Sequence, residues 1–81
     1  MDEAEVFHAL ALAIREETGN PEVAVEPAMT ANDIPGWDSL AHVRIVMNAE
    51  ARTGAVVEMS DTYKAANVGD LCRIITAAIG R

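Results

Sequence analysis

The chain has 81 residues, which allows one small domain over residues 1–81. Its net charge of −7 (6 − 13) argues against a nucleic-acid binder, because phosphate recognition needs clustered cations. Its apolar fraction of 51% is too high for a disordered acidic tail, and its one cysteine excludes an internal disulfide and a multi-cysteine zinc site. No apolar run approaches the ~20 residues that span a membrane and no cationic leader opens the chain, so we expect an acidic, cytoplasmic monomer without a metal.

Apolar residues recur at helical spacing over residues 2–18, so we predict a first helix there, ended by the breaker Gly19-Asn20-Pro21. Residues 20–37 contain all three prolines and keep no helical or strand period, which predicts a loop. This loop is longer than the ~12–15 residues that a loop without a function usually reaches, so we expect its apolar side chains to pin it over the helix ends. These side chains are Val23, Val25, Met29, Ile34 and Trp37.

A second helix is predicted from Asp38 or Ser39 to about residue 52, with Gly54 suited to the left-handed position that follows a helix. A very short third helix is predicted to start at a cap formed by Ser60 or Asp61 and to end at about residue 66.

The fourth helix is predicted to begin at Val68, with Asn67 as its cap and Gly80 as its stop signal. Its apolar stripe makes Cys72 a buried core thiol. Three longer helices, one short third helix and a long first loop predict an all-α fold, a small four-helix bundle.

The segment Gly36-Trp37-Asp38-Ser39-Leu40 places a serine at the start of the second helix, directly after an acid. Ser and Asp are both preferred helix caps, so one interpretation is a non-enzymatic helical interaction module in which Ser39 only caps the helix. Trp37 is then expected to act as a hydrophobic staple at the first turn.

A nucleophilic serine is a second interpretation, and it requires a base within hydrogen-bond reach. Only His8 and His42 could serve, and the strand–turn–helix context of a serine-hydrolase elbow is missing. An aliphatic chain of 81 residues also leaves little room for a substrate pocket. We therefore expect no catalytic residue and no enzyme activity, and we expect His42 to lie on the helix surface.

The segment resembles the attachment motif of acyl carrier proteins, and the resemblance continues along the second helix and resumes at Asn67-Val68-Gly69-Asp70-Leu71. Helix order and chain length agree as well, so the resemblance covers most of the chain. It implies an acyl-carrier-protein-like four-helix bundle in which Ser39, flanked by Asp38 and Leu40, bears a covalent 4′-phosphopantetheine arm. It also implies that acyl groups are held as thioesters on the terminal thiol of this arm.

The resemblance implies partners as well. A phosphopantetheinyl transferase would add the arm from coenzyme A, and acyl-transferring, ketosynthase or acyl- or aminoacyl-ligase enzymes would load and use it. A phosphodiester on Ser39 would lie at the start of a helix, where backbone N–H groups and the helix dipole favour an anion.

The second helix is more apolar than a core-facing helix needs to be. At 100° per residue its apolar arc spans roughly 220°, against the ~100° that core packing requires. We expect the excess beside Ser39 to form a partner-docking patch of Leu40, Val43, Arg44 and Met47, the alternative being that these apolar residues are all buried. The acidity of the whole chain favours partners with basic docking surfaces.

Carriers of fatty acid synthesis in the resembled family usually have acids along this helix, whereas here Arg44 and Arg52 stand among Asp38 and Glu50. This difference favours a carrier dedicated to a specialised pathway, polyketide-like or another secondary-metabolite pathway. An aminoacyl or peptidyl carrier of a nonribosomal-peptide-type pathway stays an open alternative, because it uses the same arm.

Overall fold

The computed structural model describes residues 1–79, and its first helix, α1, spans Glu3–Thr18. Asp2 caps this helix by accepting a hydrogen bond from the Glu5 backbone N–H at 2.9 Å, while the Glu5 carboxylate accepts from the Asp2 N–H at 3.1 Å. This reciprocal pair satisfies two amide groups that have no partner within the helix. The prediction of a helix over residues 2–18 is therefore confirmed, with Asp2 as its cap.

The long loop after α1 is pinned as expected, and it also contains one element that the sequence pattern did not indicate. Val25 and Ile34 are buried, and Val23, Met29 and Trp37 pack partly buried against the core. The additional element is η1, a short 3₁₀ helix at Ala31–Asp33. The Asp33 carboxylate accepts from the Thr30 backbone N–H at 2.9 Å, which closes this turn locally.

α2 spans Ser39–Thr53 and ends at Gly54, whose φ of 78° is left-handed as predicted. α4 spans Val68–Ala78, and its cap is Asn67, whose side chain accepts from the Asp70 backbone N–H at 2.8 Å. Both predicted helix starts are confirmed. The predicted stop at Gly80 lies outside the described residues.

The predicted bounds of the short third helix are wrong. α3 spans Met59–Thr62, so it begins before Ser60 and ends well before residue 66. Its N-cap residue, Glu58, makes no side-chain capping bond, and the Asp61 carboxylate instead forms an ion pair with Lys64 at 3.1 Å. The helix is held by tertiary contact, since Thr62 is only 1% exposed.

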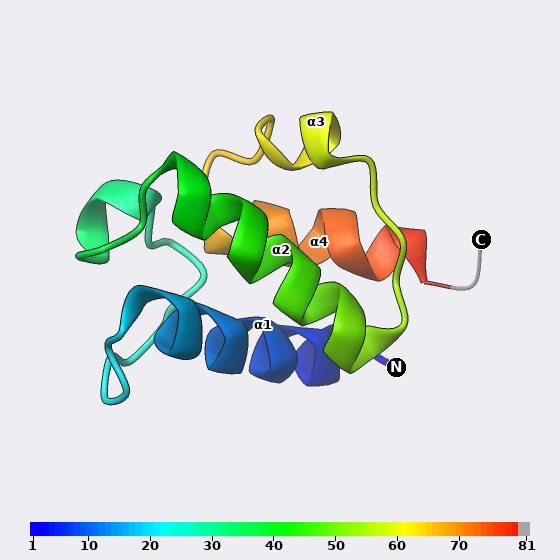
Figure 1. Ribbon diagram of the computed structural model, residues 1–81. Helices are drawn as coiled ribbons and strands as arrows, with labels where there is room; N and C mark the ends of the chain where they lie inside the picture. The colour runs from blue at the N-terminus through cyan, green and yellow to red at the C-terminus, as the bar shows by residue number, and fades with distance from the viewer. Residues whose placement is uncertain (80–81) are drawn as a thin grey trace.

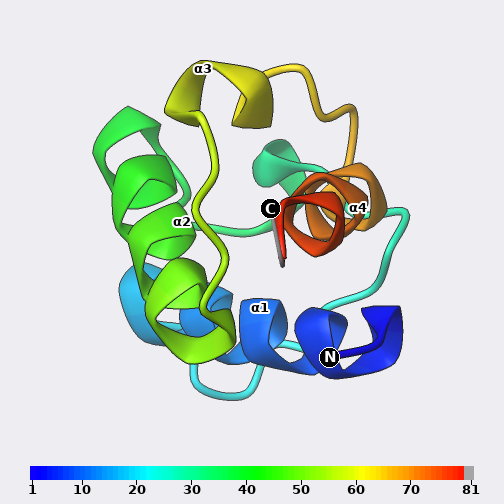
Figure 2. The same cartoon turned by 90° about the vertical axis from the view of Figure 1, so that its right-hand side faces the viewer.

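The helices enclose one aliphatic core, which confirms the all-α four-helix fold for the described residues. α2 crosses over α1, α4 packs on α1, and α3 bridges α2 and α4 (Figure 1). Seen end-on, α1, α2, α3 and α4 surround the centre of the molecule (Figure 2). Cys72 is 2% exposed within this core, as predicted, and burial raises the pKa of its thiol. The largest fully buried side chains are Leu10, Ile14, Ile34, Ile45, Leu71 and Ile75.

No helix among residues 1–79 is both long enough and apolar enough to cross a membrane.

Candidate functional site

The residues that precede α2 are held in place by the C-terminal end of α1. Gly36 has a φ of 89°, and a Cβ at this position would lie 2.8 Å from the Thr18 carbonyl oxygen. The side-chain amide of Asn20 donates to the Pro35 carbonyl at 2.6 Å. The absence of a side chain at residue 36 and the hydrogen bond to the Pro35 carbonyl thus favour this turn into α2.

The first turn of α2 assigns different roles to Asp38 and Ser39. The Asp38 carboxylate accepts from the Ala41 backbone N–H at 2.8 Å, so Asp38 is the N-cap. Ser39 is the first residue of the helix, its side chain is exposed, and none of residues 1–79 forms a hydrogen bond with its hydroxyl. The interpretation of Ser39 as the cap is therefore wrong, and the cap is the neighbouring acid.

The start of α2 also suits a negatively charged group. Within the described part of the chain, the backbone N–H groups of Ser39 and Leu40 have no hydrogen-bond acceptor. Such amides at the start of a helix of 15 residues favour an anion by about 0.3–1 kcal/mol. An exposed hydroxyl beside two unpaired N–H groups fits a phosphodiester at this residue.

His42, one turn into α2, is held by a network that the sequence pattern did not reveal. The Trp37 indole N–H can only donate, so at 3.2 Å it donates to Nδ1 of His42. The remaining ring proton is therefore on Nε2, which donates to the Thr62 hydroxyl at 2.8 Å. That hydroxyl donates in turn to the Met59 carbonyl at 2.6 Å, and the ring of Tyr63 stacks on the imidazole at a centroid distance of 4.5 Å.

This network corrects the expectation that His42 is a surface histidine. The ring is half-buried, and burial holds its pKa below the usual value of 6.5. Both ring nitrogens are occupied, so His42 is not available as a base for Ser39, and the hydrolase interpretation has no geometry here.

Trp37 occupies the expected staple position, but its partner is a histidine and the contact is a hydrogen bond. Trp37 precedes the cap and His42 is the fourth helical residue, which are the two positions of a hydrophobic staple. This spacing was a signal for the Trp37–His42 pair. No pattern indicated that Thr62 and Tyr63 join it, because they belong to the short helix whose bounds were mispredicted.

The four residues of the expected docking patch lie on α2, and they differ in exposure. Leu40 is 60% exposed and Met47 is 58% exposed, so the alternative in which both are buried core is contradicted. Arg44 is exposed, and Val43 is half-buried. The patch is thus accessible chiefly through Leu40, Arg44 and Met47.

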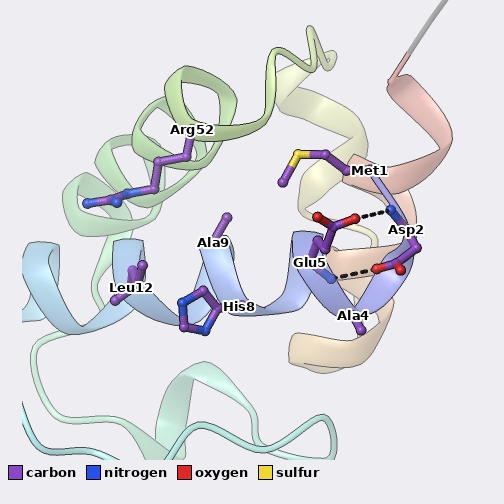
Figure 3. A pocket seen from close by; sticks show the side chains of 8 residues that line it. All are labelled: Met1, Asp2, Ala4, Glu5, His8, Ala9, Leu12 and Arg52. Atoms are coloured by element: carbon purple, nitrogen blue, oxygen red, sulfur yellow. Dashed lines mark hydrogen bonds between the residues drawn. The ribbon is translucent and has the colours of Figure 1, made fainter.

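A groove of about 570 Å³ lies at the opposite end of α2 (Figure 3). Arg52, in the last turn of α2, extends over α1 there, and Met1 and His8 line the same hollow. Because α2 has 15 residues, this groove lies about 20 Å from Ser39 along the helix. The hollow beside the site is smaller, about 190 Å³, and is lined by Ala31, Trp37, His42, Thr62, Tyr63, Ala65, Asn67 and Leu71.

An all-helical bundle that exposes an unactivated serine at the start of its second helix has the architecture of a small carrier domain. The acyl carrier protein of Kineococcus radiotolerans is 33% identical to this chain over 78 residues, which cover 96% of each chain. The chain therefore belongs to the acyl carrier protein family, and its role is that of a carrier. No protein-family model matches it, and no solved structure matches it.

Proposed function

We propose that this chain is a single carrier domain that bears 4′-phosphopantetheine on Ser39 and has no catalytic activity of its own. The observation that carries the proposal is the exposed Ser39 hydroxyl, which has no hydrogen-bond partner among residues 1–79 and follows directly on the Asp38 cap. A phosphopantetheinyl transferase would supply the chemistry of attachment, so the carrier itself needs no activating base.

The residues around Ser39 have defined parts in this proposal. Asp38 caps the first turn of the helix and so fixes the position of the Ser39 backbone, and the Ser39 side chain is exposed. The N–H groups of Ser39 and Leu40 favour the negative phosphodiester. The arm supplies a terminal thiol on which acyl groups are held as thioesters and a flexible tether that raises their effective concentration at a docked enzyme.

We further propose that the carrier serves a specialised, polyketide-like or other secondary-metabolite pathway. Support comes from the mixed charge of α2, in which Arg44 and Arg52 stand among Asp38 and Glu50. Acyl-transferring, ketosynthase or ligase enzymes are the expected partners, and they dock at Leu40, Val43, Arg44 and Met47. Loading by an acyltransferase supports an acyl carrier, whereas loading by an adenylating enzyme identifies an aminoacyl or peptidyl carrier.

The proposal is tested by incubating the chain with coenzyme A and a phosphopantetheinyl transferase of broad specificity, followed by intact-mass measurement. We expect one phosphopantetheine adduct on the wild type and none on Ser39→Ala. Ser60 is the other serine in the sequence and is also exposed, so Ser60→Ala is the matched control and keeps the adduct. An unmodified wild type, or an adduct that survives Ser39→Ala, contradicts the proposal and leaves a helical interaction module.

A further inference from the structure

The exposed side of α2 combines apolar side chains with one cation. Leu40, Arg44 and Met47 follow one another at spacings of four and three residues, so they lie along the same face of the helix. Leu40 and Met47 are more than half exposed, and Arg44, which is also exposed, lies between them along the helix. This face begins one residue after Ser39.

Arg44 differs from the other cations in the described part of the chain. Arg52 pairs with Glu16 at 3.0 Å, Lys64 pairs with Asp61 at 3.1 Å, and Arg73 pairs with Asp70. Arg15 donates from Nε to the Val23 carbonyl at 2.8 Å. Arg44 alone among the Lys and Arg side chains of residues 1–79 makes neither a hydrogen bond nor an ion pair.

The carboxylates nearest this face are hydrogen-bonded to other groups of the chain. Asp38 accepts from the Ala41 N–H at the cap, and Glu50 accepts from the Val57 backbone N–H at 2.9 Å. On the adjacent α1, Glu16 and Glu17 both accept from the side-chain amide of Asn48, at 3.1 and 2.8 Å. These hydrogen bonds orient the carboxylates but leave them charged, and none of them forms an ion pair with Arg44, so the exposed Arg44 guanidinium is open to an anion from outside the chain.

We propose that a partner enzyme docks on this face and places a carboxylate against the Arg44 guanidinium, with apolar side chains over Leu40 and Met47. The inference rests on the proposed function, since it assumes that enzymes acting on the Ser39 arm bind at α2. It departs from the expectation, drawn from the net charge of −7, that the partner is basic. A guanidinium binds a carboxylate through two parallel hydrogen bonds, so an acid is the group that it recognises best.

At a docked interface, the charge of Arg44 should matter more than the net charge of the chain, because salt screens distant charges more than charges in contact. At physiological ionic strength the screening length is about 8 Å, so acids elsewhere on the chain act weakly on a partner that touches α2. An ion pair in contact, shielded from water by flanking apolar groups, keeps its strength. The acidity of the chain affects approach, and Arg44 determines the docked position.

The test uses the phosphopantetheine-loaded full chain and a purified enzyme that transfers an acyl or aminoacyl group to or from the Ser39 arm. We expect kcat/KM for transfer to fall about fivefold for Arg44→Ala and about 30-fold for Arg44→Glu, while Arg44→Lys stays within about threefold. The change should appear in KM and not in kcat, and it should shrink at high salt, because the variants weaken docking and not chemistry.

Arg52→Glu is the matched control, because it makes the same charge change on the same helix at a cation that is already paired. We expect its kcat/KM to stay within about twofold of the wild type. If Arg44→Glu transfers as fast as the wild type, or faster, or if Arg52→Glu is impaired equally, the inference is overturned. Loading of Ser39 is measured first by intact mass, so that a failure of the proposed carrier function can be distinguished from a failure of the docking inference.

Discussion

At the scale of single residues, two neighbours at the start of α2 have different roles: Asp38 caps the helix, and the hydroxyl of Ser39 is free for modification. Asp38 satisfies a backbone N–H that the helix leaves unpaired, and the next residue, Ser39, contributes nothing to the cap. This separation matters for a modified serine, because a hydroxyl that is needed for capping would lose that role on modification. Here the hydroxyl can be esterified without breaking any hydrogen bond within residues 1–79.

The division of roles predicts unequal effects of two neighbouring substitutions on the free energy of unfolding. Asp38→Ala removes the cap and should lower the free energy of unfolding by about 1 kcal/mol. Ser39→Ala removes no hydrogen bond and should change it by less than about 0.5 kcal/mol. Urea unfolding of the unmodified chain measures both, and Asp38→Asn, which keeps an acceptor, should recover most of the loss. A larger loss for Ser39→Ala than for Asp38→Ala would return the cap to the serine.

At the scale of elements, the orientation of α2 depends on how the loop meets the end of α1. Gly36 combines a left-handed φ with a close approach, in which an added Cβ would lie 2.8 Å from the Thr18 carbonyl oxygen. Gly54, after α2, has a similar φ of 78° but has open space around it. A comparison of substitutions at the two glycines therefore distinguishes the cost of backbone strain, which both share, from the cost of a steric clash, which only Gly36 has.

We predict that Gly36→Ala destabilises the chain more than Gly54→Ala does. Both variants incur the cost of a left-handed non-glycine residue, about 1–2 kcal/mol, and only Gly36→Ala adds a contact with backbone that cannot give way cheaply. Thermal unfolding of the two variants side by side measures the difference. Equal losses would mean that the loop moves away from α1 freely, and the close approach would then have no structural role.

The ends of the longer helices could be predicted because local chemistry determines them. Asn67 caps α4 and Gly54 follows α2 through interactions among a few residues, which a sequence pattern contains. α3 could not be predicted with correct bounds, because a helix of four residues has no stable local form. Its position depends on the burial of Thr62 against other elements, which no local pattern encodes.

In the candidate site, too, the features that depend on neighbouring residues could be predicted, and those that depend on distant residues could not. The position of Ser39 at a helix start follows from its immediate neighbours, and so does the Trp37–His42 staple spacing. The sequence does not decide whether Ser39 or Asp38 serves as the cap, because both residue types suit the position. The bond from His42 to Thr62 joins residues 20 apart and was outside the reach of any local pattern.

At the scale of the whole molecule, a polar contact connects the short helix α3 to α2. The one buried residue of α3 is Thr62, and the hydroxyl of Thr62 is bonded to His42 on α2. The same imidazole holds the loop through Trp37 and stacks on Tyr63 just after α3. The neutral ring of His42 therefore connects three separate segments of the bundle.

This connection predicts how stability depends on pH. Burial lowers the pKa of folded His42 below the unfolded value of 6.5, and protonation of Nδ1 would also place a proton against the Trp37 N–H. The folded state thus favours the neutral ring: its stabilising effect is complete above pH 6.5 and is lost as the pH falls through the lower, folded pKa.

We expect urea unfolding to give a lower free energy at about pH 5.5 than at about pH 8, with faster amide hydrogen exchange in α3 and a changed Trp37 fluorescence at the lower pH. His42→Gln offers an acceptor and a donor but does not titrate, so its stability should lose this dependence. The other histidine, His8, is exposed and belongs to no such network, so His8→Gln should keep the wild-type profile. Parallel losses in the wild type and in His42→Gln would show that carboxylates, and not this imidazole, determine the acid response of the bundle.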